Sequence, residues 1–362
     1  MREPAFEAAA SALLEAETRL RLLDRVIPTN VERERGRLAQ DLERGKPPIP
    51  AFRYARFEAA DELRHGLSRL ARELRARGPI GDLLAGRADE LALEAALVEA
   101  LGTPDFIRLA AERFATPRAS EAAELAALLT RFEAAAPGAI EGERIPSDGS
   151  DPRSLVRVLE RAIASLGGSV RIELRKDLGS VAAAGDGVVF VRPGVALSVL
   201  EASRIARHEL EAHVLPRLAA RREHCPVYRA GARGASEDEE GRALWIEERA
   251  GLLGPERRRA LALRHQLAAG VRAGETFAQT CEAAREFGLE LPAAVDSAVR
   301  AHRGGGLGRE IVYLPAFLRV RAACIAEPWL EGELARGRVS LEAARTLSAL
   351  RVQGVVSSST GA

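Results

Sequence analysis

The six residues His208-Glu209-Leu210-Glu211-Ala212-His213 carry the side chains of this sequence that are best suited to chemistry. Two neutral imidazoles can ligate a divalent metal, and a neighbouring carboxylate can accept a proton from water. Together these groups suit a hydrolase that activates water on a metal ion. The alternative is ordinary helix surface, with two partly buried histidines and a solvated Glu209.

The interval between the two histidines differs from that of the common short zinc motif. In that motif the histidines are four residues apart on one helical face, with a Glu between them. His208 and His213 are five residues apart, which separates their rings by roughly 140° on an ideal α-helix. A local π-helical widening would bring both rings to one face, and such bulges are frequent at functional sites. The spacing alone does not decide between metal binding and the helix-surface alternative.

A catalytic zinc site needs a third protein ligand, and the next predicted helix offers four acids. Glu239 and Glu240 lie in its first turn, where the helix dipole favours a carboxylate. Glu247 and Glu248 lie further along the same helix. These acids could equally form a capping cluster or pair with nearby arginines. From the residues alone, the choice among the four stays open.

At these residues the chain resembles the family that includes the microtubule-associated tyrosine carboxypeptidases. Bacterial members of that family are described by a Gln-Glu-Gly-Leu-Ala motif. The family has the same five-residue histidine interval, with Glu directly after the first His, and residues 208–215 match that segment. The resemblance implies that His208 and His213 are zinc ligands and that Glu209 is the general base.

The same resemblance points to Glu240 as the third ligand. Glu239-Glu240-Gly241-Arg242-Ala243 aligns with the five-residue motif, with Glu239 in place of Gln and Arg242 in place of Leu. The ligand position and the glycine after it are retained. For Glu247 we favour a surface ion pair over the alternative, in which it orients a ligand histidine.

A second segment, 305–314, resembles a family stretch of glycines followed by a basic–acidic pair and Val-Tyr-Leu. A carboxypeptidase needs a cation for the terminal carboxylate of its substrate, and Arg309 is our candidate because a guanidinium can donate two parallel hydrogen bonds. Tyr313 is our candidate donor to the developing oxyanion. The alternatives are a surface arginine and a core tyrosine. Residues 28–30 and 102–106 also resemble family landmarks, so the resemblance extends over most of the chain.

The elements that must position these residues are predicted to be mainly helices. Helical periodicity precedes residue 140 in five segments, namely 5–45, 55–77, 82–101, 106–115 and 119–135. Residues 170–174 then alternate apolar and polar, as a half-buried strand does. The Asp-Gly pair within 184–187, between two short apolar runs, predicts a β-hairpin.

Two capping boxes predict where the helices of the site begin. Ser198, with Glu201 three residues later, begins a helix that carries both histidines and is expected to stop at Pro216. Ser236, with Glu239 three residues later, is expected to begin the helix that carries the candidate third ligand.

The expected fold is therefore mainly α with a small antiparallel β-sheet, in the α+β class. The resemblance adds a zincin-like metallopeptidase core. We expect a helical N-terminal region over 1–150, a catalytic domain over 151–354 and a flexible tail over 355–362.

Composition excludes several other functions. The net charge of +1 and the aromatic content of 4% argue against nucleic acid as a partner. No run of about 18 apolar residues occurs, so no membrane span is expected. Three scattered cysteines fit a reducing cytoplasm, and the preference for arginine over lysine hints at a GC-rich bacterium. The oligomeric state stays open.

We therefore expect a zinc-dependent metallocarboxypeptidase that acts on a peptide or protein C-terminus. Zn²⁺ would be held by His208, His213 and Glu240, with Glu209 as the base. One alternative is a catalytically degenerate family member that serves as a binding or regulatory module, because two motif positions are altered. Another is a helical scaffold whose histidines are incidental.

Overall fold

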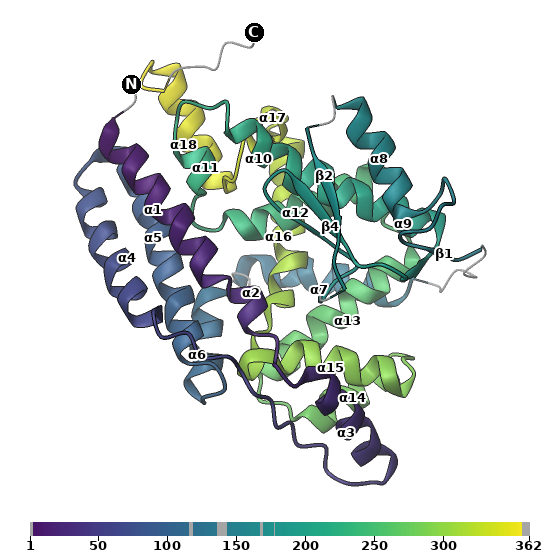
Figure 1. The fold of residues 1–362 in the computed structure, drawn as a ribbon. Coiled ribbons are helices and arrows are strands. Elements are labelled where there is room, and N and C mark those ends of the chain that lie inside the picture. Colours follow the sequence, from purple (N-terminus) through teal and green to yellow (C-terminus); the bar gives the residue numbers. More distant parts are fainter. Residues whose placement is uncertain (1–2, 116–118, 136–142, 167–168, 177, 357–362) are drawn as a thin grey trace. The chain divides into compact units, whose positions relative to one another are not determined.

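Helices predominate in the computed structural model of the chain, and its strands are few and short (Figure 1). The structure describes residues 3–115, 119–135, 143–166, 169–176 and 178–356. Within these ranges, no helix combines the length and the hydropathy needed to cross a membrane. The predicted α+β class, mainly helical with a small β component, is confirmed.

The chain forms two compact units, and each is assembled from separate stretches of sequence. Unit 1 comprises residues 1–10, 136–257 and 316–362, and unit 2 comprises 11–135 and 258–315. These units interleave along the chain, whereas the domains expected over 1–150 and 151–354 are contiguous. The division at residue 150 stays a prediction, and most of the expected tail lies outside the described residues.

Unit 1 contains the strands and the helices that carry the histidine segment. Its elements are β1 (Ile145–Pro146), α8 (Leu155–Ser165), β2 (Arg171–Leu174), β3 (Ala182–Ala184), β4 (Val188–Val191), β5 (Ala196–Leu197), α9 (Val199–Arg207), η1 (His208–Val214), α10 (Leu215–Ala220), α11 (Val227–Ala230), α12 (Ala235–Arg249), most of α16 (Tyr313–Ala326), α17 (Trp329–Leu334) and α18 (Leu341–Val352).

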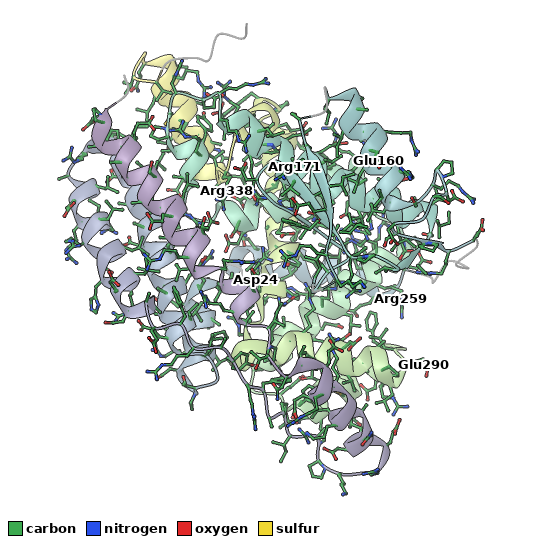
Figure 2. The ribbon with its side chains drawn as sticks, in the orientation of Figure 1. Asp24, Glu160, Arg171, Arg259, Glu290 and Arg338 are labelled. Carbon is green, nitrogen blue, oxygen red and sulfur yellow. The ribbon has the colours of Figure 1, made fainter. Side chains whose placement is uncertain are left out.

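The strands form two small sheets rather than one antiparallel sheet. β3 and β4 form the predicted hairpin, with Ala183 opposite Phe190, and β1 pairs antiparallel with β5. β2, which begins at Arg171 (labelled in Figure 2), pairs with the other edge of β4 and runs parallel to it. The predicted antiparallel pairing is therefore present in β3–β4 and in β1–β5, and β2 adds a parallel pair, because the chain reverses direction both before and after β3 and so β2 and β4 run the same way.

A hydrophobic core joins this sheet to the helices that carry the histidines. Leu159 of α8, Val189 of β4 and Ile205 of α9 are buried in it together with Leu210 and Val214 of η1. α9 begins at the predicted capping box, in which the Ser198 hydroxyl accepts from Glu201 N–H and the Glu201 carboxylate accepts from Ser198 N–H. One side of η1 is thereby fixed in the core.

The helix of the histidines does not stop at Pro216, as the sequence predicted, but continues as α10. Proline has no N–H to donate to the carbonyl four residues earlier, which here belongs to Ala212. Nη1 of Arg242 donates to that oxygen at 3.3 Å instead. A side chain of another helix therefore supplies the hydrogen bond that the proline removes.

Unit 2 is helical in its described residues. Its elements are most of α1 (Pro4–Leu20), α2 (Leu22–Arg25), α3 (Val31–Glu43), α4 (Ala60–Arg75), α5 (Gly78–Glu99), α6 (Asp105–Arg113), α7 (Ala119–Glu133), most of α13 (Pro255–Arg272), α14 (Phe277–Glu286), α15 (Leu291–Gly306) and the 3₁₀ turn η2 (Arg309–Val312).

Two segments that resemble family landmarks meet in unit 2. Gly102 N–H donates to the Gly304 carbonyl at 3.0 Å, and Gly304 N–H donates to the hydroxyl of Tyr54 at 2.8 Å. Gly304 has a φ of +74°, and a Cβ at this position would lie 2.5 Å from the Phe106 ring. Only glycine satisfies both the backbone conformation and the close approach of that ring.

Candidate metal centre

The segment that carries the two histidines is a π-helix, η1 (His208–Val214), between the α-helices α9 and α10. A π-turn closes its hydrogen bonds over five residues, so side chains five apart come to the same face. The ring centroids of His208 and His213 are 5.2 Å apart, with their planes inclined by 55°. The widening that a shared face requires is therefore present in this helix.

Glu240 lies on α12, which packs against η1. Its Oε2 is 3.7 Å from Nε2 of His208, and one ligand atom from each of His208, His213 and Glu240 lies within 4.8 Å of the other two. The structure thus brings together the three residues that the sequence singled out as ligands. Two imidazoles and one carboxylate form a possible metal site.

The glycine after Glu240 allows α12 to approach α16 closely. A Cβ at Gly241 would lie 2.5 Å from the backbone carbon and oxygen of Ala316. Any other residue there would push the two helices apart and displace Glu240 with them. Close packing of the two helices therefore explains why a glycine follows Glu240, and the sequence alone did not reveal this constraint.

α12 does not begin at the predicted capping box of Ser236 and Glu239. It begins at Ala235, and Gly234 precedes it with a φ of +75°. Ser236 Oγ instead donates to Glu237 at 3.0 Å. The physical reason is that Gly234 adopts the left-handed turn, so the helix starts earlier and Glu239 is left to face η1.

Glu247 does not form a surface ion pair, and that expectation was wrong. Its side chain is fully buried, and its Oε1 lies 2.8 Å from Nδ1 of His208. Arg257 donates two hydrogen bonds of 3.0 Å to the same carboxylate. Burial alone would raise the pKa of Glu247, but the charge of Arg257 and the hydrogen bond with His208 lower it to about 2. The carboxylate is therefore ionised.

Glu239 occupies the corresponding place beside the other histidine. Its Oε2 is 3.4 Å from Nδ1 of His213, and Arg217 and Arg338 stand 3.8 and 3.7 Å from its oxygens. Burial alone would raise the pKa of Glu239, but the hydrogen bond with His213 and the two arginines lower it to about 2. Glu248 instead pairs with Arg321 at 3.2 Å.

The donor set fits a divalent metal in two respects. Each Nδ1 faces a carboxylate, so an Nδ1–H donating to it leaves Nε2 as the free ligand nitrogen, the usual arrangement around metal-bound histidines. The site is also negative. Burial lowers the pKa of His213, yet Glu239, Glu240 and Glu209 outweigh that effect and raise it. Groups that attract a proton here also attract a metal cation.

Glu209 follows His208 on η1 and is partly buried. Among the described residues, no hydrogen bond or ion pair holds its carboxylate, so its oxygens are available to accept a proton. Its charge contributes to the raised pKa of His213, which shows that it acts on the same site.

Arg309 and Tyr313 belong to unit 2, whereas the two histidines and Glu240 belong to unit 1. Nη1 of Arg309 donates to the Tyr313 hydroxyl at 3.0 Å, and the guanidinium carbon is 5.4 Å from the centroid of the tyrosine ring. The two candidates are therefore paired with each other. Their roles toward a substrate stay predictions.

Sequence reasoning missed the arginines that support the site. Arg257 follows the Gly254-Pro255 break and Arg338 lies almost a hundred residues beyond Glu239, so no periodicity links them to the histidines. The spacing of Glu240 and Glu247 along one helical face was the available signal for Glu247.

A comparison with family models identifies the family to which this chain belongs. The model described as microtubule-associated tyrosine carboxypeptidase matches residues 42–360. The chain belongs to this family, which supports a carboxypeptidase-like function on a peptide or protein substrate. No curated protein matches the chain significantly.

Proposed function

We propose that this protein is a zinc-dependent metallocarboxypeptidase with a zincin-like core, which removes the C-terminal residue of a peptide or protein. The observation that carries the proposal is the π-turn, which brings His208 and His213 to one face beside Glu240. Family membership supports the carboxypeptidase part, and the donor set supports the metal.

His208, His213 and Glu240 would hold the zinc ion. Two nitrogens and one oxygen, with a position left open, are a set that catalytic zinc accepts. When bound, the ion supplies Lewis acidity, which lowers the pKa of water and polarises a substrate carbonyl. Glu247 and Glu239 hold the imidazoles in the tautomer that leaves Nε2 for the ion.

Glu209 serves as the general base and then as the general acid in this proposal. Its carboxylate takes a proton from the attacking water and passes it to the amine that leaves when the peptide bond breaks. We assign Arg309 to the terminal carboxylate of the substrate and Tyr313 to the developing oxyanion.

Peptides with varied C-terminal residues test the proposal. We expect zinc-loaded protein to release one terminal residue, detected by mass spectrometry, and chelator to stop the release. Glu209→Gln should lower the rate by roughly 10² to 10⁴-fold while zinc stays bound. Glu211→Gln is the matched control, since Glu211 is on the same π-turn but outside the ligand cluster and should keep nearly full activity.

The outcomes separate the alternatives. Internal cleavage would indicate an endopeptidase. Bound zinc without cleavage of any peptide would indicate a degenerate family member that serves as a binding module. Absence of bound zinc would leave a helical scaffold with incidental histidines.

We also place the protein in the cytoplasm of a bacterium. All three cysteines are free and buried, and arginine greatly outnumbers lysine. A bacterial setting makes tubulin an unsuitable substrate and favours another peptide or protein tail.

A further inference from the structure

A cavity of about 460 Å³ lies in unit 1, on a different face of α12 from Glu240. Arg242 and Glu240 are two residues apart, which separates them by roughly 200° around the helix. The residues that matter for the cavity's chemistry are Arg207, Arg242, Trp245, Arg249, Cys324 and Glu331. The volume is within the range of cavities that hold small molecules.

Among the described arginines that line this cavity, two form ion pairs and Arg242 does not. Arg249 is bound to Glu331, with Nη1 2.5 Å from Oε2, and Arg207 lies 3.7 Å from Glu211. Arg242 is within ion-pair distance of no carboxylate in the part of the chain that the structure describes. The cavity thus contains a cation outside any direct ion pair with the described residues. Burial lowers the pKa of Arg242, although the charges of Glu239, Glu211 and Glu331 act on it from a distance.

The guanidinium of Arg242 also keeps most of its hydrogen-bonding capacity. Its hydrogen bond to the Ala212 carbonyl uses one N–H, and no second one is found among the described residues. Arginine carries five N–H groups. Cys324 does not balance the charge either, because burial raises the pKa of its thiol to about 11 and keeps it neutral.

One wall of the cavity is apolar and fixed. The Nε1–H of Trp245 donates to Glu331 at 2.8 Å, which holds the indole in place, and Ile246 lies beside it in the cavity lining. A ligand that meets this wall gains from burial of apolar surface, while Arg242 supplies a directional contact.

We propose that this cavity binds a small organic oxyanion, a carboxylate or a phosphate monoester, with an aromatic or aliphatic body. The anionic group lies on Arg242, with Arg207 as a second cation, and the body packs on Trp245 and Ile246. The cavity lining contains none of the proposed metal ligands, so binding there can be tested independently of the proposed peptidase activity.

Tryptophan fluorescence tests the proposal directly. The chain has two tryptophans, so Trp329→Phe leaves Trp245 as the only indole reporter. In that background we would titrate benzoate, phenyl phosphate and the neutral analogue benzamide, with and without zinc. We expect saturable change with at least one anion at a Kd of about 1 mM or tighter, and none with benzamide. The tighter of the two anions identifies the kind of oxyanion.

Arg242→Gln should weaken anion binding at least about tenfold. Because this change also removes the donor to Ala212, Arg207→Gln provides a second test that spares that contact, with a smaller loss expected. Arg345→Gln, on α18 and outside the cavity lining, is the matched control and should leave the Kd within twofold, by the roughly independent behaviour of distant sites. Circular dichroism establishes that each variant is folded.

A saturable response to benzamide equal to that of the tighter anion would overturn the proposal, as would saturation that survives both Arg242→Gln and Arg207→Gln. Failure of both anions to saturate would overturn it too. None of these results depends on peptide hydrolysis, so a failure here is distinguishable from a failure of the metallopeptidase proposal.

Discussion

His208 and His213 lie on one π-turn, but the protein supports them differently. Nδ1 of His208 is 2.8 Å from Glu247, a carboxylate with no solvent exposure. Arg257 donates two hydrogen bonds to that carboxylate, and Nη1 of Arg204 lies 3.5 Å from its Oε1. This histidine is held by a buried network in which a neighbouring cation balances the acid.

His213 has a looser support. Its Nδ1 is 3.4 Å from Glu239, and the other oxygen of Glu239 is buried without a hydrogen-bond partner in the described part of the chain. Arg217 and Arg338, the latter labelled in Figure 2, remain at 3.8 and 3.7 Å. Distances of this size give charge compensation but little directional bonding.

This difference indicates which of the two supporting carboxylates tolerates substitution. Glu239 is where this chain departs from the Gln of the family motif, and it is the loosely held partner. Glu247 has its polar atoms engaged, so its replacement disturbs several groups at once. We therefore infer that His208 is the anchored side of the metal centre and His213 the adaptable side.

Removal of either histidine should have the largest effect. If three ligands share about 10 kcal/mol of binding energy, His208→Ala and His213→Ala should each lower zinc affinity by roughly 200- to 300-fold. Zinc per chain after dialysis, measured by mass spectrometry, should fall from about one to near zero. Retention of a full equivalent by either variant would contradict the assigned ligands.

Glu247→Gln should come next. It removes the charge partner of the partly buried Arg257, so the metal-free protein should lose about 3 kcal/mol of unfolding free energy. Zinc affinity should fall by roughly 10 to 100-fold, since the amide orients His208 less well. Urea unfolding and zinc competition with a chromogenic chelator measure the two effects.

Glu310→Gln is the matched control for Glu247→Gln. Glu310 is a buried carboxylate of unit 2 bound to Arg300 at 2.6 Å, with no histidine partner. It should cost stability and leave zinc affinity unchanged. A similar loss of zinc affinity in both variants would mean that Glu247 acts through the fold rather than through His208.

Glu239→Gln should have a smaller effect and would sharpen the comparison most. The amide oxygen can still accept from His213, and the family motif has Gln at this position. Zinc affinity should change by less than about tenfold. The anchored and adaptable assignments are reversed if Glu239→Gln weakens zinc binding more than Glu247→Gln does.

The smallest expected effect is a pH dependence at Glu310. Burial alone would raise the pKa of Glu310, but Arg300 and Arg303 lower it from 4.5 to about 2. Because the folded pKa is the lower one, the carboxylate stabilises the fold fully at neutral pH. That stabilisation is lost as pH falls from about 4.5 toward about 2. Glu310→Gln should flatten unfolding free energy against pH in this window, and an unchanged slope would exclude the ionised pair.

Much of the site was predictable because it depends on local spacing. The five-residue interval indicated that the two rings could share a face only on a widened turn, the Ser198 capping box predicted the start of α9, and the Asp-Gly pair located the hairpin. Each of these signals lies within a few residues, where backbone geometry decides the outcome.

The rest depends on contacts between distant residues. Nothing near Pro216 indicates that Arg242 replaces the missing hydrogen bond and lets the helix continue. Nothing near Glu247 indicates that its carboxylate will be buried and hydrogen-bonded by Arg257. The parallel pairing of β2 with β4 depends on the path of the chain between these strands, and periodicity carries no such information.

A π-turn is an α-helix with one residue inserted, and this has a consequence for the ancestry of the site. Deleting one residue between His208 and His213 is expected to convert the π-turn into regular α-helix. The two histidines would then have the four-residue interval of the common zinc motif. The five-residue and four-residue histidine motifs, which differ as sequence patterns, would then be separated by the deletion of a single codon. Searches keyed to a fixed interval would overlook such neighbours, while searches that allow one gap in the helix would recover them.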